Sequence, residues 1–495
     1  MSLNTAISNQ VKQPEPTLKE KTAKGLFWGG ISNVVQQLLS LGFGLFLARL
    51  LAPDDYGLVA MLGIFMGIAA TIQDSGFSVA LINRPFRHED YNAVFWFSLC
   101  VGTVSYITLF FCAPLIAQFF NYPELKNLAR VQFLWFFFGS TATAHATVLK
   151  KKLMIKERSI ITLSAMAISG IIGVILAYKG FAYWALVIQT ALMSLIISSL
   201  YWLYSPWRPT FTINITPLKE MFSFGVKILI SGFFLQINSN IFAAILGKFY
   251  TKIDTGYFAQ GEKWMKMGST NIIGNMLSEV TQPVLVETMK DTERKRNVFR
   301  KMLRFSSFIS FPAMLGLAFV ANEFVVIALS EKWLPSVLFL QMLCVWGATI
   351  PISGLYTQLI MSKNRSDIYM WNVIGLGIVQ LIIILSTLSY GIQYMAFLYV
   401  IINIVWILAW HYSSHRLINL RLWHLVKDVF PFLTVSVISI IITWFFTKDI
   451  MNIYLRFILK VLLTACIYIS IMWYSKSVIV RECFAFVMQR KEIKK

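Results

Sequence analysis

Long apolar stretches recur along the whole chain, and basic residues accumulate in every second gap between them. Of the 495 residues, 57% are hydrophobic and 14% are charged, whereas a soluble domain carries about 25% charged residues. A helix that crosses a bilayer needs roughly 20 mainly apolar residues. The pattern therefore predicts an all-α polytopic membrane protein with about 14 transmembrane helices. The predicted spans lie near residues 26–51, 57–73, 93–117, 129–148, 159–178, 181–203, 221–247, 267–287, 305–329, 335–361, 368–389, 392–412, 429–447 and 453–475.

The distribution of lysine and arginine predicts the orientation of the chain. Most of the 44 basic residues fall in the gaps that share a side with the N-terminus, including the runs 150–158 and 290–301. Cytoplasmic loops carry such an excess, so both termini are expected in the cytoplasm. The net charge of +21 is then explained by loops that face an anionic inner leaflet, and no nucleic-acid partner is expected. The five cysteines and the absence of nucleotide or zinc motifs predict no metal site and no cofactor.

A weak internal repeat organises the chain. Residues 49–60 (RLLAPDDYGLVA) and 248–259 (KFYTKIDTGYFA) share a base, an acid, a glycine and an alanine in register, 199 positions apart. Six spans separate the two copies, so both point the same way, as in a parallel repeat with its axis along the membrane normal. This predicts two pseudo-symmetric six-helix lobes plus a C-terminal helix pair; chance similarity is the alternative.

The predicted units follow from this repeat and from the loops. They are a cytosolic tail (1–25), an N-lobe with spans one to six (26–207), a C-lobe with spans seven to twelve (208–424), spans thirteen and fourteen (425–480) and a basic cytosolic tail (481–495).

Polar side chains fall on single faces of the spans that correspond under the repeat. Polar residues inside a membrane are costly and turn toward other helices or water. We therefore expect a hydrated cavity between the lobes, lined by spans one, two, seven and eight. The alternative is interhelical hydrogen bonding in a dry bundle, and in span two close packing of Gly63 and Gly67 is the simpler interpretation. The candidates are Asn33, Gln36 and Gln37 in span one, Asp74 in span two, Lys227, Ser231 and Asn238 in span seven, and Asn271, Asn275, Glu279 and Gln282 in span eight.

Lys227 is the leading candidate among these residues. It lies eight positions beyond Lys219, which is about 12 Å in from the inner end of its helix. A cation at this depth would attract an anionic group such as a phosphate, although the side chain could also extend back toward the cytoplasm. Glu279 would balance Lys227, bind a coupling cation or only form structural hydrogen bonds.

Several motifs resemble those of one family. Arg49 to Gly57, Asp74-Ser75-Gly76, the basic run 149–153 and Asp254 to Tyr257 are similar to signatures of the polysaccharide-export flippases, in the multidrug/oligosaccharidyl-lipid/polysaccharide exporter superfamily. The resemblance implies alternating-access translocation of an undecaprenyl-diphosphate-linked oligosaccharide across the bacterial inner (cytoplasmic) membrane, for surface polysaccharide assembly, and no enzymatic activity. It identifies no universal site motif.

The resemblance leaves the substrate and the energy source open. The expected partners are the polyprenyl-diphosphate-linked oligosaccharide and membrane lipids, with a coupling ion (Na+ or H+) and other polysaccharide-assembly proteins as further candidates. The alternative functions within the superfamily are a multidrug or small-molecule cation antiporter and a flippase for cell-wall lipid precursors. A membrane-embedded enzyme is the alternative from a different class, and the chain carries no acid/base constellation that supports it.

Overall fold

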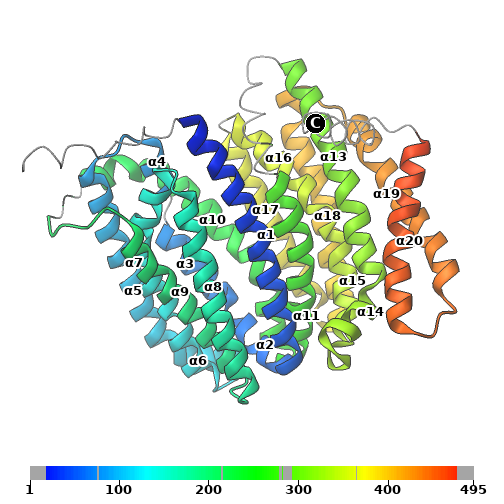
Figure 1. The fold of residues 1–495 in the computed structure, drawn as a ribbon, viewed down its shortest axis with the longest axis horizontal. Helices are drawn as coiled ribbons and strands as arrows, with labels where there is room; N and C mark the ends of the chain where they lie inside the picture. Colours follow the sequence, from blue (N-terminus) through cyan, green and yellow to red (C-terminus); the bar gives the residue numbers. More distant parts are fainter. Residues whose placement is uncertain are drawn as a thin grey trace, which may run out of the picture.

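The computed structural model describes residues 18–74, 77–212, 214, 216–277, 281, 292–363 and 365–475. These residues form helices packed side by side in a broad bundle (Figure 1). Within these ranges there is no strand, and twelve helices are long and apolar enough to cross a membrane. The prediction of an all-α polytopic membrane protein is therefore confirmed. Of the two other predicted spans, 129–148 falls on helices that are not among these twelve, and 267–287 lies partly outside the described residues.

The first half of the chain forms one group of helices. The predicted second span is broken at Leu62, and the predicted fourth span is broken at Phe133, so each consists of two consecutive helices. The helices are α1 (Leu18–Leu50), α2 (Pro53–Met61), α3 (Gly63–Asp74), α4 (Phe77–Asn83), α5 (His88–Phe120), α6 (Leu125–Gln132), α7 (Leu134–Lys151), α8 (Ile155–Tyr178) and α9 (Tyr183–Tyr204).

The second half repeats this arrangement with more interruptions. Short non-α turns separate several of its helices, among them the π-helix η1 and the turns η2 and η3. The elements are α10 (Thr216–Phe249), α11 (Lys252–Lys266), η1 (Met267–Gly274), α13 (Thr292–Phe319), α14 (Ala321–Phe324), η2 (Val325–Leu329), η3 (Glu331–Trp333), α15 (Ser336–Gly347), α16 (Ile350–Ser362), α17 (Ser366–Thr387), η4 (Leu388–Tyr390) and α18 (Ile392–Ile418).

The two halves lie on opposite sides of the bundle. In Figure 1, α5, α7 and α9 are at one side and α13, α15 and α18 at the other, with α1, α10 and α11 between them. The final pair, α19 (Leu422–Thr447) and α20 (Ile453–Tyr474), lies beyond the second half, and α19 packs against α13. This is the expected pair of lobes with an added C-terminal helix pair.

The start of the eighth span differs from the prediction. The expected boundary at residue 267 is wrong, because α11 begins at Lys252 and continues directly into η1. The helix starts where Thr251 accepts a hydrogen bond from the backbone N–H of Asp254 (3.1 Å), and the Asp254 carboxylate in turn accepts one from the N–H of Thr251 (3.3 Å). Such a reciprocal cap is a strong helix start. The charged residues Glu262, Lys263 and Lys266 are therefore part of a helix and not of a loop.

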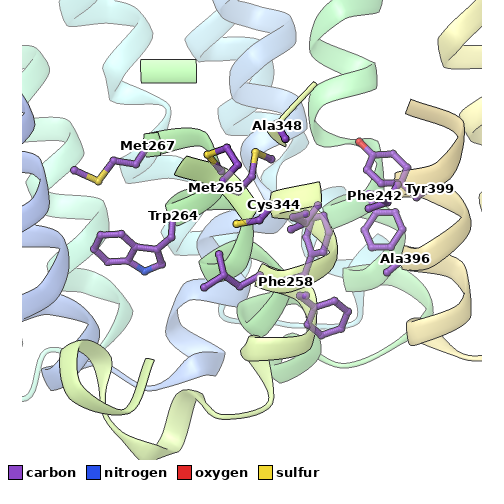
Figure 2. Close-up of a cluster of buried hydrophobic side chains, with 14 of the residues drawn as sticks. Phe242, Phe258, Trp264, Met265, Met267, Cys344, Ala348, Ala396 and Tyr399 are labelled. Atoms are coloured by element: carbon purple, nitrogen blue, oxygen red, sulfur yellow. The ribbon is translucent and has the colours of Figure 1, made fainter. Parts of the chain in front are cut away.

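A buried apolar cluster anchors α11 in the second lobe. Phe242, Phe258 and Tyr399 stack with ring centroids 4.4 and 4.7 Å apart, which gives a rigid aromatic contact between α10, α11 and α18. Figure 2 shows Trp264 and Met267 on the opposite side of this cluster from Phe242 and Tyr399. One face of α11 is thus fixed in the lobe core, and the face with Trp264 is turned away from that aromatic stack.

Candidate functional site

The two copies of the repeat pack directly against each other. A Cβ added to Gly57 in α2 would lie 2.7 Å from the carbonyl carbon of Lys252, and one added to Gly256 in α11 would lie 2.7 Å from the carbonyl carbon of Pro53. Such distances are far below ordinary carbon–carbon contact, so both positions need the missing side chain of glycine. The crossing is reciprocal, as expected for two related halves that meet around a twofold axis.

Basic side chains reinforce this contact across the two lobes. The Arg49 guanidinium donates to the carbonyl oxygens of Ile327 and Ala328, the latter at 2.9 Å, at the end of η2. Its repeat equivalent, Lys248, donates to the carbonyl oxygen of Phe119 at the end of α5. Each lobe therefore places one cation on helix-terminal carbonyls of the other, where orphan acceptors and the helix dipole favour positive charge.

The second lobe also caps the end of α1. Trp333 Nε1 donates to the carbonyl oxygen of Ala48 (2.7 Å), and Lys332 Nζ donates to that of Arg49 (2.6 Å). Burial lowers the pKa of Lys332 from its usual value. On the other side, Lys252 Nζ lies 3.7 Å from the Asp54 carboxylate. The basic-residue bias predicts that this end of the bundle faces outward. We therefore call the contacts of residues 49–57 and 248–256, Lys332 and Trp333 the outer junction.

A pocket lined by amide and apolar side chains lies between α1 and η1, further toward the predicted inner side. Its volume is about 420 Å³, within the range of small-ligand sites. The lining includes four candidates proposed from the sequence, Asn33, Gln37, Asn271 and Asn275, together with apolar residues such as Leu41 and Met267. The structure thus brings one polar face of span one against one polar face of span eight. We call this site the α1–η1 pocket.

Lys263 stands at the outer end of the same helix face. Lys263, Met267, Asn271 and Asn275 follow one another at intervals of four residues, so they share one side of α11 and η1. Lys263 Nζ would lie 3.2 Å from a Cβ on Gly44 of α1, which places the cation directly between the lobes. It is eleven residues into a helix that starts at the outer junction, which corresponds to a depth of about 16 Å.

Lys263 is an uncompensated charge in this position. Among the described residues no acidic side chain pairs with it, whereas the adjacent Glu262 and Lys266 neutralise each other at 2.9 Å. Its ammonium lies 5.5 Å from the ring centroid of Tyr56 and 5.7 Å from that of Trp264, within cation–π range. The Tyr56 hydroxyl and the Trp264 indole nitrogen are buried and have no hydrogen-bond partner among the described residues. A cation and two buried groups that can donate hydrogen bonds are suited to an anion.

The other candidates are distributed differently. Gln36 donates to Ser32 on its own helix (2.8 Å), and Ser231 is buried in α10. Asn238 was expected in the cavity, but its amide donates to the carbonyl oxygen of Val373 in α17 (2.8 Å), inside the second lobe. The Asn238 amide of α10 therefore faces α17, and a role for this residue in the cavity stays a prediction. The side chains of Lys227 and Asp74, and all of Glu279 and Gln282, lie outside the described residues.

The small-residue stripe of α3 packs as its simpler interpretation predicted. A Cβ on Gly67 would lie 3.0 Å from the amide carbon of Gln236, and one on Gly63 would lie 2.9 Å from Asn240 Oδ1, both in α10. The interface between the lobes therefore has a filled side at α3–α10 and a side with the α1–η1 pocket.

Two helical lobes joined at one membrane face, with a polar pocket and a lone cation between them, define the class of two-lobed membrane transporters. Residues 46–338 match the model of a family described as polysaccharide biosynthesis protein. The chain belongs to this family. The resemblance to polysaccharide exporters that its motifs suggested is thereby confirmed.

Individual relatives agree with this assignment. The chain is 24% identical to the teichuronic acid biosynthesis protein TuaB of Bacillus subtilis (strain 168) over 431 residues, which cover 86% of this chain and 89% of that protein. It is 26% identical to the lipopolysaccharide biosynthesis protein WzxC of Escherichia coli (strain K12) over 362 residues, 71% of this chain and 72% of that protein.

Solved structures share the fold. The lipid II flippase MurJ, in an inward closed conformation, superposes with a TM-score of 0.73 and covers 91% of this chain and 99% of its own, at 15% identity. An inward-facing multidrug resistance transporter of the MATE family gives a TM-score of 0.63, at 18% identity, over 77% of this chain and 94% of its own. This chain therefore has the same two-lobed helical fold as these two structures.

Sequence reasoning missed Lys263, and a signal for it was present. The repeat aligns Thr251 and Asp254 with Ala52 and Asp55, and Asp55 accepts a hydrogen bond from the N–H of Ala52 (2.9 Å) at the start of α2. A helix that starts at residue 53 in one copy predicts one that starts near residue 252 in the other. That start would have moved Lys263 from a loop into the membrane.

Proposed function

We propose that this protein translocates a polyprenyl-diphosphate-linked oligosaccharide from the inner to the outer face of a bacterial cytoplasmic membrane, for assembly of a surface polysaccharide. The observation that carries the proposal is Lys263, which lies between the lobes about 16 Å along α11 from its start and has no acidic partner among the described residues. The names of the relatives point the same way, since they concern teichuronic acid, lipopolysaccharide and, in Rhizobium meliloti (strain 1021), succinoglycan transport. The bias of basic residues supports termini on the cytoplasmic side.

The chemistry of the site suits such a head group. The diphosphate would accept charge-assisted hydrogen bonds from Lys263, which are stronger than neutral ones, and further ones from the Tyr56 hydroxyl and the Trp264 indole. The amides of Gln37 and Asn271 in the α1–η1 pocket would bind sugar hydroxyls. Val34 and Leu38, which also line this pocket, are 61% and 64% exposed on α1, so an isoprenoid tail could stay in lipid beside them.

Transport then requires that the outer junction separates. A substrate shifts the balance between conformations only if it binds one of them better. Lys263 lies between Gly44 of one lobe and the aromatic rings of both, so a bound diphosphate replaces contacts that hold the lobes together. Reopening toward the outside would release the head group where the polysaccharide is assembled.

The pocket also weighs against the antiporter alternative. Organic cations need acidic or aromatic partners, and none of the residues that line the α1–η1 pocket within the described ranges is acidic or aromatic. A positive charge at its outer end would repel such substrates further.

The test is replacement of Lys263 in cells that make the polysaccharide. Lys263→Gln should leave membrane abundance unchanged and cause lipid-linked repeat units to accumulate at the inner face, measured by mass spectrometry with a sidedness assay. Lys263→Arg should retain part of the export. Lys126→Gln, which removes one charge from an exposed position, is the control and should export normally.

Three results would contradict the proposal. Full export by Lys263→Gln would remove the role of this cation. Missing or truncated lipid-linked sugars after deletion of the gene would indicate an enzyme. Unchanged lipids together with drug sensitivity would indicate an antiporter.

A further inference from the structure

A second polar pocket lies inside the first lobe, apart from the α1–η1 pocket. Its volume is about 380 Å³, and it is bounded by α3, α4, α7, α8 and α9. Two cations, Lys150 at the end of α7 and Arg158 in the first turn of α8, line it at the predicted cytoplasmic end. Gln73, Thr143 and Ser194 line it further in. We call it the inner pocket.

A tight turn brings the two cations together. Between α7 and α8 the N–H of Met154 donates to the carbonyl oxygen of Leu149 (3.0 Å), and Leu153 adopts a left-handed backbone conformation (φ 55°). This conformation is costly for a residue with a branched side chain, so it is held by its surroundings, in which Leu149 is completely buried. Lys150 and Arg158 therefore face one site although eight positions separate them.

The three lysines at 150–152 make different contacts. Lys151 Nζ donates to the carbonyl oxygens of Leu81 (3.1 Å) and Arg84, which holds the end of α4. Lys152 Nζ lies over the ring of Phe86, 5.8 Å from its centroid. Only Lys150 among them lines the inner pocket. If this basic run served only to set the orientation of the chain in the membrane, its three side chains would not need such different contacts.

The cations of the inner pocket lack acidic partners. Neither Lys150 nor Arg158 forms an ion pair with any acidic side chain that the structure describes. The Nε of Arg158 is buried and has no hydrogen-bond partner among the described residues. A guanidinium with an unused buried N–H, beside an ammonium, is the arrangement that binds phosphate in proteins.

We propose that the inner pocket binds a phosphate group of a membrane lipid at the inner leaflet. Under the proposed function, on which this assignment of the source rests, the lipid is the transported polyprenyl diphosphate, captured here before its head group reaches Lys263. The same chemistry would accept the phosphate of an anionic phospholipid. The amide of Gln73 and the hydroxyls of Thr143 and Ser194 would face the group that the phosphate carries.

The test measures binding to the full-length protein in neutral detergent by native mass spectrometry. The probes are undecaprenyl diphosphate and phosphatidylglycerol, titrated separately. Lys150→Gln/Arg158→Gln should weaken binding of one probe about tenfold or more, because two charge-assisted contacts are lost. Lys152→Gln/Lys156→Gln is the matched control, since it removes two charges from the same loop. Its two lysines lie over the rings of Phe86 and Trp28, and it should bind like the wild type.

The outcomes separate the source of the phosphate and the two proposals. Selective loss of undecaprenyl diphosphate binding supports capture of the substrate, and selective loss of phosphatidylglycerol binding supports the same site with a membrane phospholipid as ligand. The proposal for the inner pocket is overturned if both double variants weaken lipid binding equally, or if neither double variant weakens it. Lys150→Arg/Arg158→Lys, which keeps both charges, should retain most of the binding and excludes misfolding as the cause. Normal export by Lys263→Gln would overturn the proposed function and leave this binding result standing.

Discussion

Gly256→Ala should separate the two lobes at the outer junction. Its added methyl group would meet the backbone of Pro53, with the carbonyl carbon at 2.7 Å and the Cα at 3.2 Å. Carbon atoms pack at about 3.5–4.0 Å, so α2 and α11 must move apart by roughly 1 Å. Backbone atoms on both sides leave no flexible side chain to absorb the strain, and overpacking of this kind costs about 1–3 kcal/mol.

The whole of this cost bears on the contact between the lobes. Alanine gains about 0.5–1 kcal/mol over glycine inside a helix, but this gain is common to both conformations and cancels from their ratio. A bias of about 1–3 kcal/mol changes the ratio of joined to separated outer ends by a factor of roughly 5–150. Gly57→Ala should have the same effect, because its new methyl group would meet the backbone of Lys252 in the reciprocal way.

The assay is a distance measurement by pulsed electron paramagnetic resonance. Spin labels on cysteines at Lys126 in the first lobe and Tyr390 in the second, both exposed, report the separation of the outer ends after the native cysteines are replaced. Gly256→Ala should populate a longer distance that is minor in the parent protein. Gly354→Ala, where an added Cβ meets nothing within 4 Å, should leave the distribution unchanged. The same distance distribution in Gly256→Ala and Gly354→Ala would refute the role of the glycine crossing.

Two other predictions concern stability and the assignment of polar residues. Glu323 is 2% exposed and forms ion pairs with both Arg456 (2.9 Å) and Lys460 (2.8 Å) of α20. Glu323→Gln should therefore destabilise the packing of α20 by about 3 kcal/mol and lower the thermal unfolding temperature of the protein in detergent. Glu331→Gln, at an exposed position, should leave that temperature unchanged. Asn238→Leu should lower the unfolding temperature and leave export intact, because the hydrogen bond of Asn238 to Val373 lies within one lobe. Asn271→Leu should impair export with little change in the unfolding temperature. The opposite pattern would indicate that Asn238 acts in the cavity.

The sequence predicted the frame of this protein because its signals are strong and local. Apolar length identified the helices, and the polar period of span one identified Asn33 and Gln37, which the structure places in the α1–η1 pocket with Asn271 and Asn275. It also predicted that the two repeat turns correspond, which follows from conserved register within one chain. These inferences need no knowledge of how one helix faces another.

Sequence reasoning carried least where the rotation of a helix decides which residues face a neighbour. Asn238 shares a helix with Ser231 and was assigned to the same cavity, but only tertiary packing shows that it faces α17. Lys263 was missed because Glu262, Lys263 and Lys266 lower the hydropathy of α11 until it looks like a loop, although two of these charges neutralise each other. A hydropathy average counts each charged residue separately and takes no account of an ion pair between two of them.

The π-helix η1 shows how two related halves come to differ. Residues 267–274 correspond through the repeat to residues 68–75, most of which lie in the ordinary α-helix α3. A π-helix takes up more residues per turn than an α-helix, so η1 acts as a local insertion present in one copy only. Exact twofold symmetry would make both lateral sides of the molecule alike. The wider winding breaks that equivalence, so that one lateral side has the α1–η1 pocket and the other has α3 packed closely on α10.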